Sequence, residues 1–438
     1  MDSTIRLEAA PPSGPQQQLR PDVRSKRRSM FASTVGNVLE WYEWSAYAVF
    51  APFIAAAMFD SKDPVSALLS TLAVFAVGFL MRPLGGIVFG RIADKRGRKF
   101  VLITTMLIMA GGSLLIGLMP TYGQVGIWAS VLLLLARVAQ GFAHGGESAT
   151  ANTYIAEIAP PAKRGQWGSI VFVAIFGGSV LAYVVGGGVT SVLGTAGVAQ
   201  WGWRIPFLFG AVLALAALYL RRGMEESDVF EAKAAATETA PIPRKAVIRA
   251  VLLMIAMTSG ITAAHYTWTS YASTFAITQR GMDPQTAYWA SVIAQSIALI
   301  TLPFWGRLSD RIGRRPLLIG SALAMVAMQF PLMGMITNDG WTLAVAATLA
   351  LCIVAVPGAM LAAVLSENFP TKIRTQGIGF AYSLSVAIFG GTAPYLNALF
   401  NSLSLGWLSS VYIIVLCLVT TFAVFKLPET KGIDLNDA

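Results

Sequence analysis

Seven ionisable side chains lie within long apolar runs of this sequence, where a charge is costly. They are Glu40, Glu43, Arg82, Arg137, His144, Glu147 and His265. An ionisable group in an apolar helix is expected to face a cavity or a partner. A guanidinium can hold a carboxylate through its planar fork, whereas carboxylates and imidazoles can take up and release a proton. These residue types predict a site that binds an anion and moves a proton.

Four polar residues of the run 125–158 share one face of the helix that we expect there. Arg137, Gln140, His144 and Glu147 follow one another at intervals of three, four and three residues, which keeps them close in angle on a helix. We predict Arg137, Gln140 and His144 to be substrate-binding residues. Arg137 has two possible roles, direct contact with substrate or a structural pair with Glu43 or Glu147, and His144 is either a proton relay or a neutral hydrogen-bonding residue.

Three carboxylates are candidates for proton coupling: Glu40, Glu43 and Glu147. A desolvated carboxylate holds its proton in a dry state and releases it when water or a cation approaches. Glu43 and Glu147 are the leading proton carriers, with a permanent ion pair to Arg137 and a helix-packing hydrogen bond as their respective alternatives. Glu40 lies at a depth similar to that of Arg82, so we expect Arg82 to form a structural ion pair with it.

A polar stripe in the run 247–277 adds further candidates for substrate binding. Its members recur at intervals of three or four residues: Thr258, Thr262, His265, Thr269 and Ser273. A polar stripe facing lipid would be too costly, so we expect it to face the cavity, with His265 and the adjacent Tyr266 contacting substrate. Hydrogen bonding between helices is the competing interpretation.

The elements that must position these residues are membrane-spanning helices. The chain is 55% hydrophobic and only 12% charged, its mean hydropathy is +0.63, and about twelve runs have the roughly 20 apolar residues that span a bilayer as a helix. This predicts an all-α membrane protein. Its basic residues lie in short loops between apolar runs, which argues against nucleic acid as the reason for the net charge of +10.

Twelve spans divide the chain into two halves of six. We predict a disordered tail, an N-terminal bundle, a linker, a C-terminal bundle and a second tail at 1–30, 31–222, 223–246, 247–427 and 428–438. The expected spans are 31–59, 66–90, 100–120, 125–158, 165–191, 201–222, 247–277, 285–308, 315–336, 340–366, 375–400 and 405–427. With both termini in the cytoplasm, 27 of the 32 basic residues fall on that side, in agreement with the positive-inside rule. The first apolar run is too long for a signal peptide and contains Glu40 and Glu43.

A charged loop motif occurs once in each half. Gly90 to Lys99 and Gly306 to Arg315 both read Gly-Arg-x-x-Asp-x-x-Gly-Arg-basic. A second pair, Glu157 to Arg164 and Glu367 to Arg374, shares Glu-x-x-Pro-x-x-x-Arg and a similar offset. Two motifs in register over two hundred residues predict parallel repeats, with a substrate site where the halves face each other.

The loop motif is expected to form a gate. We predict gating roles for Gly90, Asp94, Gly97, Arg98, Asp310 and Arg314. Asp94 would meet the positive N-terminus of the eleventh helix, and also Arg98, in one access state only. A solvated loop explains the basic residues but not the aspartate and the glycines.

These motifs resemble the major facilitator superfamily, and within it the metabolite:proton symporters. The resemblance rests on Gly90 to Lys99, Gly36-Asn37-x-x-Glu40-Trp41-Tyr42-Glu43, Phe79 to Gly86, Arg137-x-x-Gln140-Gly141, Gly145-Gly146-Glu147 and Trp201 to Phe207. It implies two pseudo-symmetric six-helix bundles and is strongest with the α-ketoglutarate permease and shikimate transporter branch. Glu43, Trp44, His144 and Ser148 depart from the usual pattern, which bears on the choice of substrate.

From the residues and the resemblance we expect alternating-access, proton-coupled uptake of a small organic anion, such as α-ketoglutarate, by a monomer in the inner membrane. The alternative is a zwitterionic osmolyte such as proline or glycine betaine, whose cation Trp41 and Tyr42 would hold; Tyr42 is therefore also a candidate substrate-binding residue. A drug exporter and a sensor without flux are weaker alternatives. No catalytic or metal-binding spacing occurs, so we expect no enzyme activity, no cofactor besides the proton, and substrate, protons and lipid as partners.

Overall fold

The fold is an assembly of long helices. The computed structural model describes residues 23–435 except 61, 97, 146–154, 156–158, 222–243 and 370–373, and this described part contains no strand. Ten of its helices are long and apolar enough to cross a membrane. The first and sixth spans, formed by α1 with α2 and by α10, complete the twelve spans that the sequence predicts.

The N-terminal half contains the first six spans. Its helices are α1 (Val23–Val49), α2 (Ala51–Met58), α3 (Pro64–Leu80), α4 (Arg82–Arg96), α5 (Arg98–Leu118), α6 (Tyr122–Val125), α7 (Ile127–Gly145), α9 (Arg164–Gln200) and α10 (Ile205–Arg221), with short 3₁₀ turns η1 (Pro161–Lys163) and η2 (Gly202–Arg204). Residues 23–30, which we predicted to be disordered, belong to α1. Gly194 breaks α9 with a positive φ of 65°, so the first helical stretch ends close to the predicted residue 191 and a second short stretch follows it.

The C-terminal half repeats this arrangement. Its helices are α12 (Arg244–Tyr266), α13 (Ala272–Arg280), α14 (Pro284–Ile312), α15 (Arg314–Met335), α16 (Gly340–Glu367), α17 (Arg374–Ser385), α18 (Ala393–Ser402) and α19 (Trp407–Phe425), with π-helical turns η3 (Thr267–Tyr271) and η4 (Val386–Gly391). The two π turns interrupt the seventh and eleventh spans. Such turns occur frequently at functional sites.

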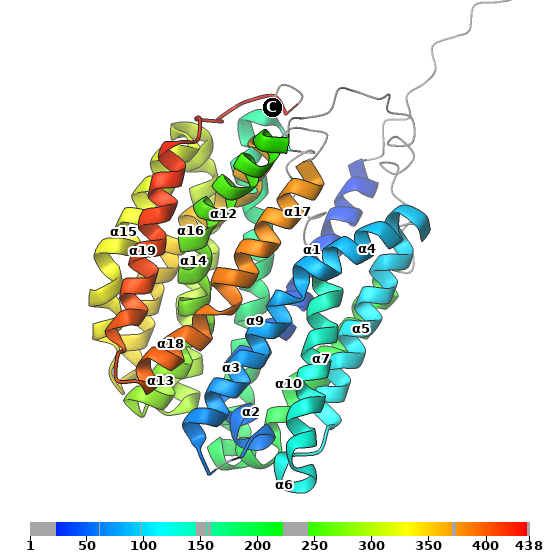
Figure 1. The fold of residues 1–438 in the computed structure, drawn as a ribbon, viewed down its shortest axis with the longest axis vertical. Helices are drawn as coiled ribbons and strands as arrows, with labels where there is room; N and C mark the ends of the chain where they lie inside the picture. The colour runs from blue at the N-terminus through cyan, green and yellow to red at the C-terminus, as the bar shows by residue number, and fades with distance from the viewer. Residues whose placement is uncertain are drawn as a thin grey trace, which may run out of the picture.

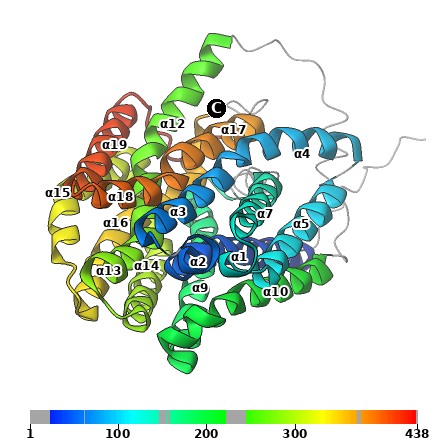
Figure 2. The same ribbon diagram turned by 60° about the horizontal axis from the view of Figure 1, so that its bottom comes forward.

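The two halves lie side by side, with α9 and α14 packed together between them (Figure 1). We call the end where α1 begins and α19 ends the terminal end, and the opposite end, where α2, α6 and α13 lie, the distal end. Figure 2 gives the same arrangement from another direction, with α1, α7 and α10 on one side and α15, α16 and α19 on the other.

Glycines let the second and fourth spans approach each other at backbone distance. A Cβ atom built on Gly141 would lie 1.9 Å from the carbonyl oxygen of Gly78, and one built on Gly145 would lie 1.9 Å from that of Arg82. Small residues permit such approach between membrane helices. The contact fixes the break between α3 and α4, with Arg82 the first residue of α4, and so positions its side chain against α1.

Candidate functional site

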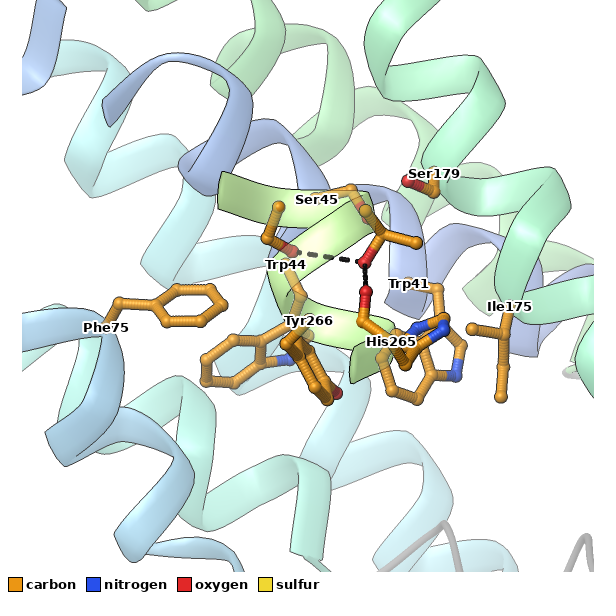
Figure 3. Close-up of a pocket in the computed structure, with 10 residues that line it drawn as sticks. Trp41, Trp44, Ser45, Phe75, Ile175, Ser179, His265 and Tyr266 are labelled. Carbon is orange, nitrogen blue, oxygen red and sulfur yellow. Dashed lines mark hydrogen bonds between the residues drawn. The ribbon is translucent and has the colours of Figure 1, made fainter. Parts of the chain in front are cut away.

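A small cavity lies between the two halves at mid-height of the bundle. The N-terminal half contributes Trp41, Trp44, Ser45, Phe75, Ile175 and Ser179, and the C-terminal half contributes His265, Tyr266, Thr269 and Ser270. In Figure 3 the rings of Trp44, Tyr266, Trp41 and His265 gather on one side, and Ser45 and Ser179 lie on the other. The volume open to the centre of a water-sized sphere is about 10 Å³, which is room for about one water molecule.

Two buried arginines stack on an aromatic residue of the cavity wall. The guanidinium carbon of Arg82 lies 4.2 Å from the ring centroid of Trp44, and that of Arg137 lies 4.4 Å from it. Arg82 also lies over Phe79 at 3.6 Å, and Arg137 lies over Tyr47 at 4.1 Å. Both side chains are at most 3% exposed. Cation–π contacts of this kind hold a desolvated guanidinium without neutralising it.

Several N–H groups of the two arginines have no hydrogen-bond partner. Within the described part of the chain, Nε and Nη2 of both Arg82 and Arg137 are buried and unpaired. Arg137 donates from Nη1 to Oε1 of Gln140 at 2.9 Å, and no described carboxylate lies within 4 Å of its guanidinium. Buried donors normally find a partner. These guanidinium N–H groups are therefore available to donate hydrogen bonds to an anion.

Glu43 reaches Arg137 only through an intervening amide. Gln140 donates from Nε2 to Ser113 at 3.0 Å and to Glu43 at 3.5 Å, while its Oε1 accepts from Arg137. The direct pair between Glu43 and Arg137, which we considered from the sequence, is therefore wrong for this conformation. Gln140 packs toward α5 and, like Arg137, is not among the residues that line the cavity, so its contact with substrate stays a prediction.

His144 and Glu40 contact each other directly. Nδ1 of His144 meets Oε1 of Glu40, and the imidazole packs edge-on against Trp41 and Trp44. The sequence paired Glu40 with Arg82 instead. The contacts observed for Arg82 are with the aromatic rings of Trp41, Trp44 and Phe79. The ion pair between Arg82 and Glu40 stays a prediction.

Tyr42 does not line the cavity, contrary to our prediction. Its hydroxyl donates to the carbonyl oxygen of Pro206 at 2.8 Å, and Gly210 leaves room for its ring. Residues 41, 44 and 45 share one helix face, whereas residue 42 is turned about 100° away from residue 41. Trp41 and Trp44, rather than Tyr42, therefore face the other half.

The polar stripe of the seventh span divides into two functions. His265, Tyr266 and Thr269 line the cavity, and Nδ1 of His265 and the hydroxyl of Tyr266 have no hydrogen-bond partner among the described residues. Thr258 bonds to Ser385 at 2.7 Å and Ser273 bonds to Tyr183 at 2.8 Å, both between helices. The middle of the stripe, from His265 to Thr269, thus faces the cavity. Its two ends, at Thr258 and Ser273, form hydrogen bonds between helices.

Asp310 ties the two halves together at the terminal end. Its carboxylate oxygens accept from the backbone N–H groups of Gly165 and Gln166 at 2.8 and 2.9 Å. These groups lie in the first turn of α9, where the helix dipole favours an anion. Gly306, one turn before Asp310, allows the approach, since a Cβ atom there would lie 2.7 Å from the carbonyl oxygen of Gly165. This explains both the glycine and the aspartate of the motif.

A buried ion-pair network surrounds this contact. Glu367 accepts from Arg164 of the N-terminal half at 3.0 Å and from Nη2 of Arg314 at 3.1 Å, and Arg314 also pairs with Asp310 at 2.7 Å. Arg164, Arg314 and Glu367 are each at most 3% exposed. Asp310 and Arg314 thus help to join the two halves at this end, and their gating role stays a prediction; Arg164 and Glu367, which the sequence showed only as parts of an internal repeat, belong to the same network.

The segment after α19 packs over this ion-pair network. Thr430 donates to Glu367 at 2.7 Å, and the carbonyl oxygen of Ile433 accepts from Arg164 at 2.9 Å. Glu429 accepts from the backbone N–H groups of Arg314 and Arg315 at 2.8 and 3.0 Å. We call residues 428–435 the strap. The sequence predicts these residues only as part of a tail and contains no signal of this packing.

The distal end is also closed by contacts between the halves. Tyr288 of α14 donates to the carbonyl oxygen of Val49 at 2.8 Å, and Tyr183 of α9 donates to that of Thr269 at 2.8 Å. The indole of Trp289 contacts Ser191 at 3.3 Å. Contacts between the halves therefore lie toward both ends of the molecule, at Asp310 on one side and at Tyr288 on the other.

The side chains of several predicted site residues lie outside the described part of the structure. Glu147 and Gly97 lie outside the described residues, and only the backbone of Asp94 and Arg98 is described. Gly90 lies in α4, and a Cβ atom there would meet nothing within 4 Å. In the described part of the chain, no group of three His, Cys, Asp or Glu side chains is placed to hold a metal ion.

Comparisons with known proteins place this architecture in a family. Residues 34–394 match the family described as Major Facilitator Superfamily. The chain is 34% identical to the alpha-ketoglutarate permease of Escherichia coli (strain K12), over 94% of this chain and 95% of that protein. It is 36% identical to the citrate-proton symporter of Klebsiella pneumoniae, over 83% of each. It is 31% identical to the proline/betaine transporter of Salmonella typhimurium (strain LT2), over 94% of this chain and 85% of that protein.

Solved structures support the fold alone. The E. coli xylose transporter XylE, in a partially occluded inward open conformation, superposes with a TM-score of 0.77 at 20% identity, covering 94% of this chain and all of that chain. The twelve helices, the cavity between two halves and the sequence relatives agree with one another. This chain belongs to the Major Facilitator Superfamily and is a multi-pass membrane transporter rather than an enzyme.

Proposed function

We propose that this transporter takes up a small organic anion, a dicarboxylate such as α-ketoglutarate, together with protons. One observation carries the proposal. Two buried guanidinium groups, of Arg82 and Arg137, stack on Trp44, which lines the cavity, and both keep unpaired N–H donors among the described residues. A guanidinium binds a carboxylate in a bidentate manner, and two of them match an anion with two carboxylates.

Proton coupling would act on the carboxylates beside these arginines. Glu43 is 4% exposed, and its Oε1 has no hydrogen-bond partner among the described residues. Protonation would remove its charge from the neighbourhood of Arg137 and leave that guanidinium to the substrate. Proton and substrate would then each favour binding of the other, which symport requires. Glu147 and the contact between Glu40 and His144 supply further groups for the same task.

Alternating access would use the two sets of closing contacts in turn. In one state the gate around Asp310 would open while the distal contacts of Tyr183 and Tyr288 hold. In the other state the distal contacts would break while the gate stays closed. The repeat of the motif supports an equivalent role for Asp94 at the N-terminus of α17. The positive-inside rule supports a cytoplasmic terminal end, and with it a cytoplasmic gate and cytoplasmic termini, in an inner-membrane protein.

Uptake by the purified protein in liposomes tests the proposal. With an inward proton gradient, we expect labelled α-ketoglutarate to accumulate, unlabelled citrate to compete, and a protonophore to abolish accumulation. Liposomes with equal pH on both sides serve as the control. Accumulation that is indifferent to the protonophore contradicts proton coupling, and absence of any dicarboxylate uptake or competition contradicts the substrate class.

A zwitterionic osmolyte is the second candidate. The cavity is walled by Trp41, Trp44 and Tyr266, and aromatic faces hold quaternary ammonium groups. The similarity to a proline/betaine transporter points the same way. If glycine betaine competes for uptake and α-ketoglutarate does not, the osmolyte is the substrate.

A further inference from the structure

A second recess lies outside the transport cavity, on the outer surface between α12 and α19. Its walls are Lys245, Ile248, Arg249, Leu252, Leu253 and Ala256 of α12, and Val419, Phe422, Ala423 and Lys426 of α19. We call these residues the α12/α19 groove. Figure 2 shows the first turns of α12 extending beyond the neighbouring helices.

The groove forms because the two helices touch at one level and separate beyond it. A Cβ atom on Gly260 would lie 2.7 Å from Cα of Cys417, and the backbone N–H of Gly260 donates to Thr420 at 3.1 Å. From this contact toward the terminal end, large apolar side chains face outward, with Leu252 59% and Phe422 63% exposed. In a membrane protein these side chains face lipid.

Three basic side chains stand at the mouth of the groove. Lys245 and Arg249 are one turn apart on α12, and Lys426 is the C-cap of α19, with its ammonium 4.5 Å from the ring centroid of Phe422. All three are exposed, and none forms an ion pair with a described residue. Their charge is therefore available to an anion.

The length of the groove matches one leaflet. From Lys245 to Ala256 the helix rises about 16 Å at 1.5 Å per residue, and half of a hydrocarbon core is about 15 Å thick. Basic residues thus lie at the depth of lipid head groups, and apolar residues line the depth of the acyl chains. We propose that the groove binds a phospholipid with an anionic head group, its phosphate on Lys245, Arg249 and Lys426 and an acyl chain along Leu252 and Phe422.

Such a lipid would hold the start of α12, the helix whose other end carries His265 and Tyr266 at the cavity. Lipid binding in the α12/α19 groove does not depend on the transported substrate, because the groove shares no lining residue with the cavity.

Native mass spectrometry of the full chain in micelles containing equal phosphatidylglycerol and phosphatidylcholine tests the proposal. We expect the wild type to retain phosphatidylglycerol in preference, and K245Q/R249Q/K426Q to retain at least about tenfold less, because each basic residue near a membrane surface contributes to the attraction. The matched control is R91Q/K95Q/R96Q, three exposed basic residues of α4 at the same end, which should keep it. Equal retention by wild type and K245Q/R249Q/K426Q overturns the proposal.

Further experiments distinguish a lipid in the α12/α19 groove from other possible occupants of that groove. Ala256→Trp fills the groove while leaving its charges, and should also lose phosphatidylglycerol; full retention means that surface charge alone binds the lipid and that the groove does not. Complete displacement by inorganic phosphate means a free-phosphate site and overturns the lipid. If phosphatidylglycerol binds only after Glu225, Glu226 and Asp228 are neutralised, the acidic linker of this chain fills the groove, and the proposal is wrong.

Discussion

At the scale of single residues, neighbours rather than residue type set the role of each buried charge. Arg82 and Arg137 are both at most 3% exposed and both lie on Trp44. From the sequence, Arg82 is expected to pair with Glu40, which lies at a similar depth. The aromatic rings that surround Arg82 could not be foreseen, because they come from other helices or turns. The structure brings both guanidinium groups to one indole, and this makes a two-carboxylate site the simplest chemical interpretation.

Replacing either arginine should remove recognition of one carboxylate. A charged hydrogen bond contributes about 1.5–3 kcal/mol, so Arg82→Gln and Arg137→Gln should each weaken dicarboxylate binding roughly 10- to 100-fold. Lysine should not restore it, since it lacks the planar fork. Binding is measured by competition against labelled α-ketoglutarate, with the exposed Arg280→Gln as control. Unchanged affinity in both variants would refute the two-arginine site.

Glu43→Gln should separate exchange from accumulation. The amide cannot carry a proton but keeps nearly the same shape beside Gln140. We expect exchange of labelled for unlabelled substrate across the membrane to persist and gradient-driven accumulation to fall about tenfold or more. Both are measured in the same liposomes. Accumulation equal to that of the wild type would exclude Glu43 as the proton carrier.

At the scale of helices, close glycine contacts decide where the site residues lie. The fourth span meets the second at Gly141 and Gly145, and the backbone of Arg82 lies directly under Gly145. The sequence showed these glycines as parts of two motifs. It did not show that the two motifs touch, because sequence spacing within one helix says nothing about its neighbour.

A methyl group at this contact should displace the arginines. Gly141→Ala places a Cβ atom 1.9 Å from the carbonyl oxygen of Gly78, and forcing atoms into a packed contact costs about 1–3 kcal/mol. We expect the melting temperature to fall by about 5 °C and substrate affinity to weaken. The control is Gly111→Ala, whose Cβ would meet nothing within 4 Å. Equal stability of the two variants would disprove the contact.

At the scale of the whole molecule, the two halves are joined at the terminal end. Asp310 and Glu367 of one half bind the first turn of α9 in the other half. A contact that exists in only one access state biases the equilibrium between states. The strap adds Thr430 and the backbone of Ile433 to the same network.

Loss of the Asp310 charge should open the terminal end. In a background without Cys352 and Cys417, a cysteine at Ser169, buried in α9 near the gate, reports access from that side. Asp310→Asn should raise its labelling by a membrane-impermeant thiol reagent about fivefold or more, with substrate affinity little changed. Arg311→Gln, an exposed neighbour, is the control. Unchanged labelling in Asp310→Asn would refute the gate.

The strap should loosen in acid. Burial tends to raise the pKa of Glu429, but hydrogen bonds from the backbone N–H groups of Arg314, Arg315, Lys431 and Thr430 outweigh it and lower that pKa below its ordinary 4.5. Because the pKa is lower in the folded protein, the stabilisation is present above the ordinary value and is lost as pH falls through the lowered one.

We therefore expect the wild type to lose thermal stability between roughly pH 5 and pH 3 by a component that Glu429→Gln lacks. At neutral pH the variant should already be less stable than the wild type. The two melting curves are compared across this range, and parallel curves at every pH would contradict the role of Glu429 in holding the strap.

The sequence by itself determined the class of fold, the repeat and the identity of most charged residues of the site, because apolar length, loop charge and helical spacing are local properties. It placed His144 and Glu40 within apolar helices, and it predicted for Asp310 and Arg314 a gating role that stays a prediction. Only the tertiary structure decided which residues meet. Tyr42 turned to α10, Glu40 met His144, Gln140 separated Glu43 from Arg137, and the strap reached Glu367 and Arg164. Such contacts join residues that are far apart in the chain, and they depend on how helices rotate and approach one another, which no periodicity within a single helix records.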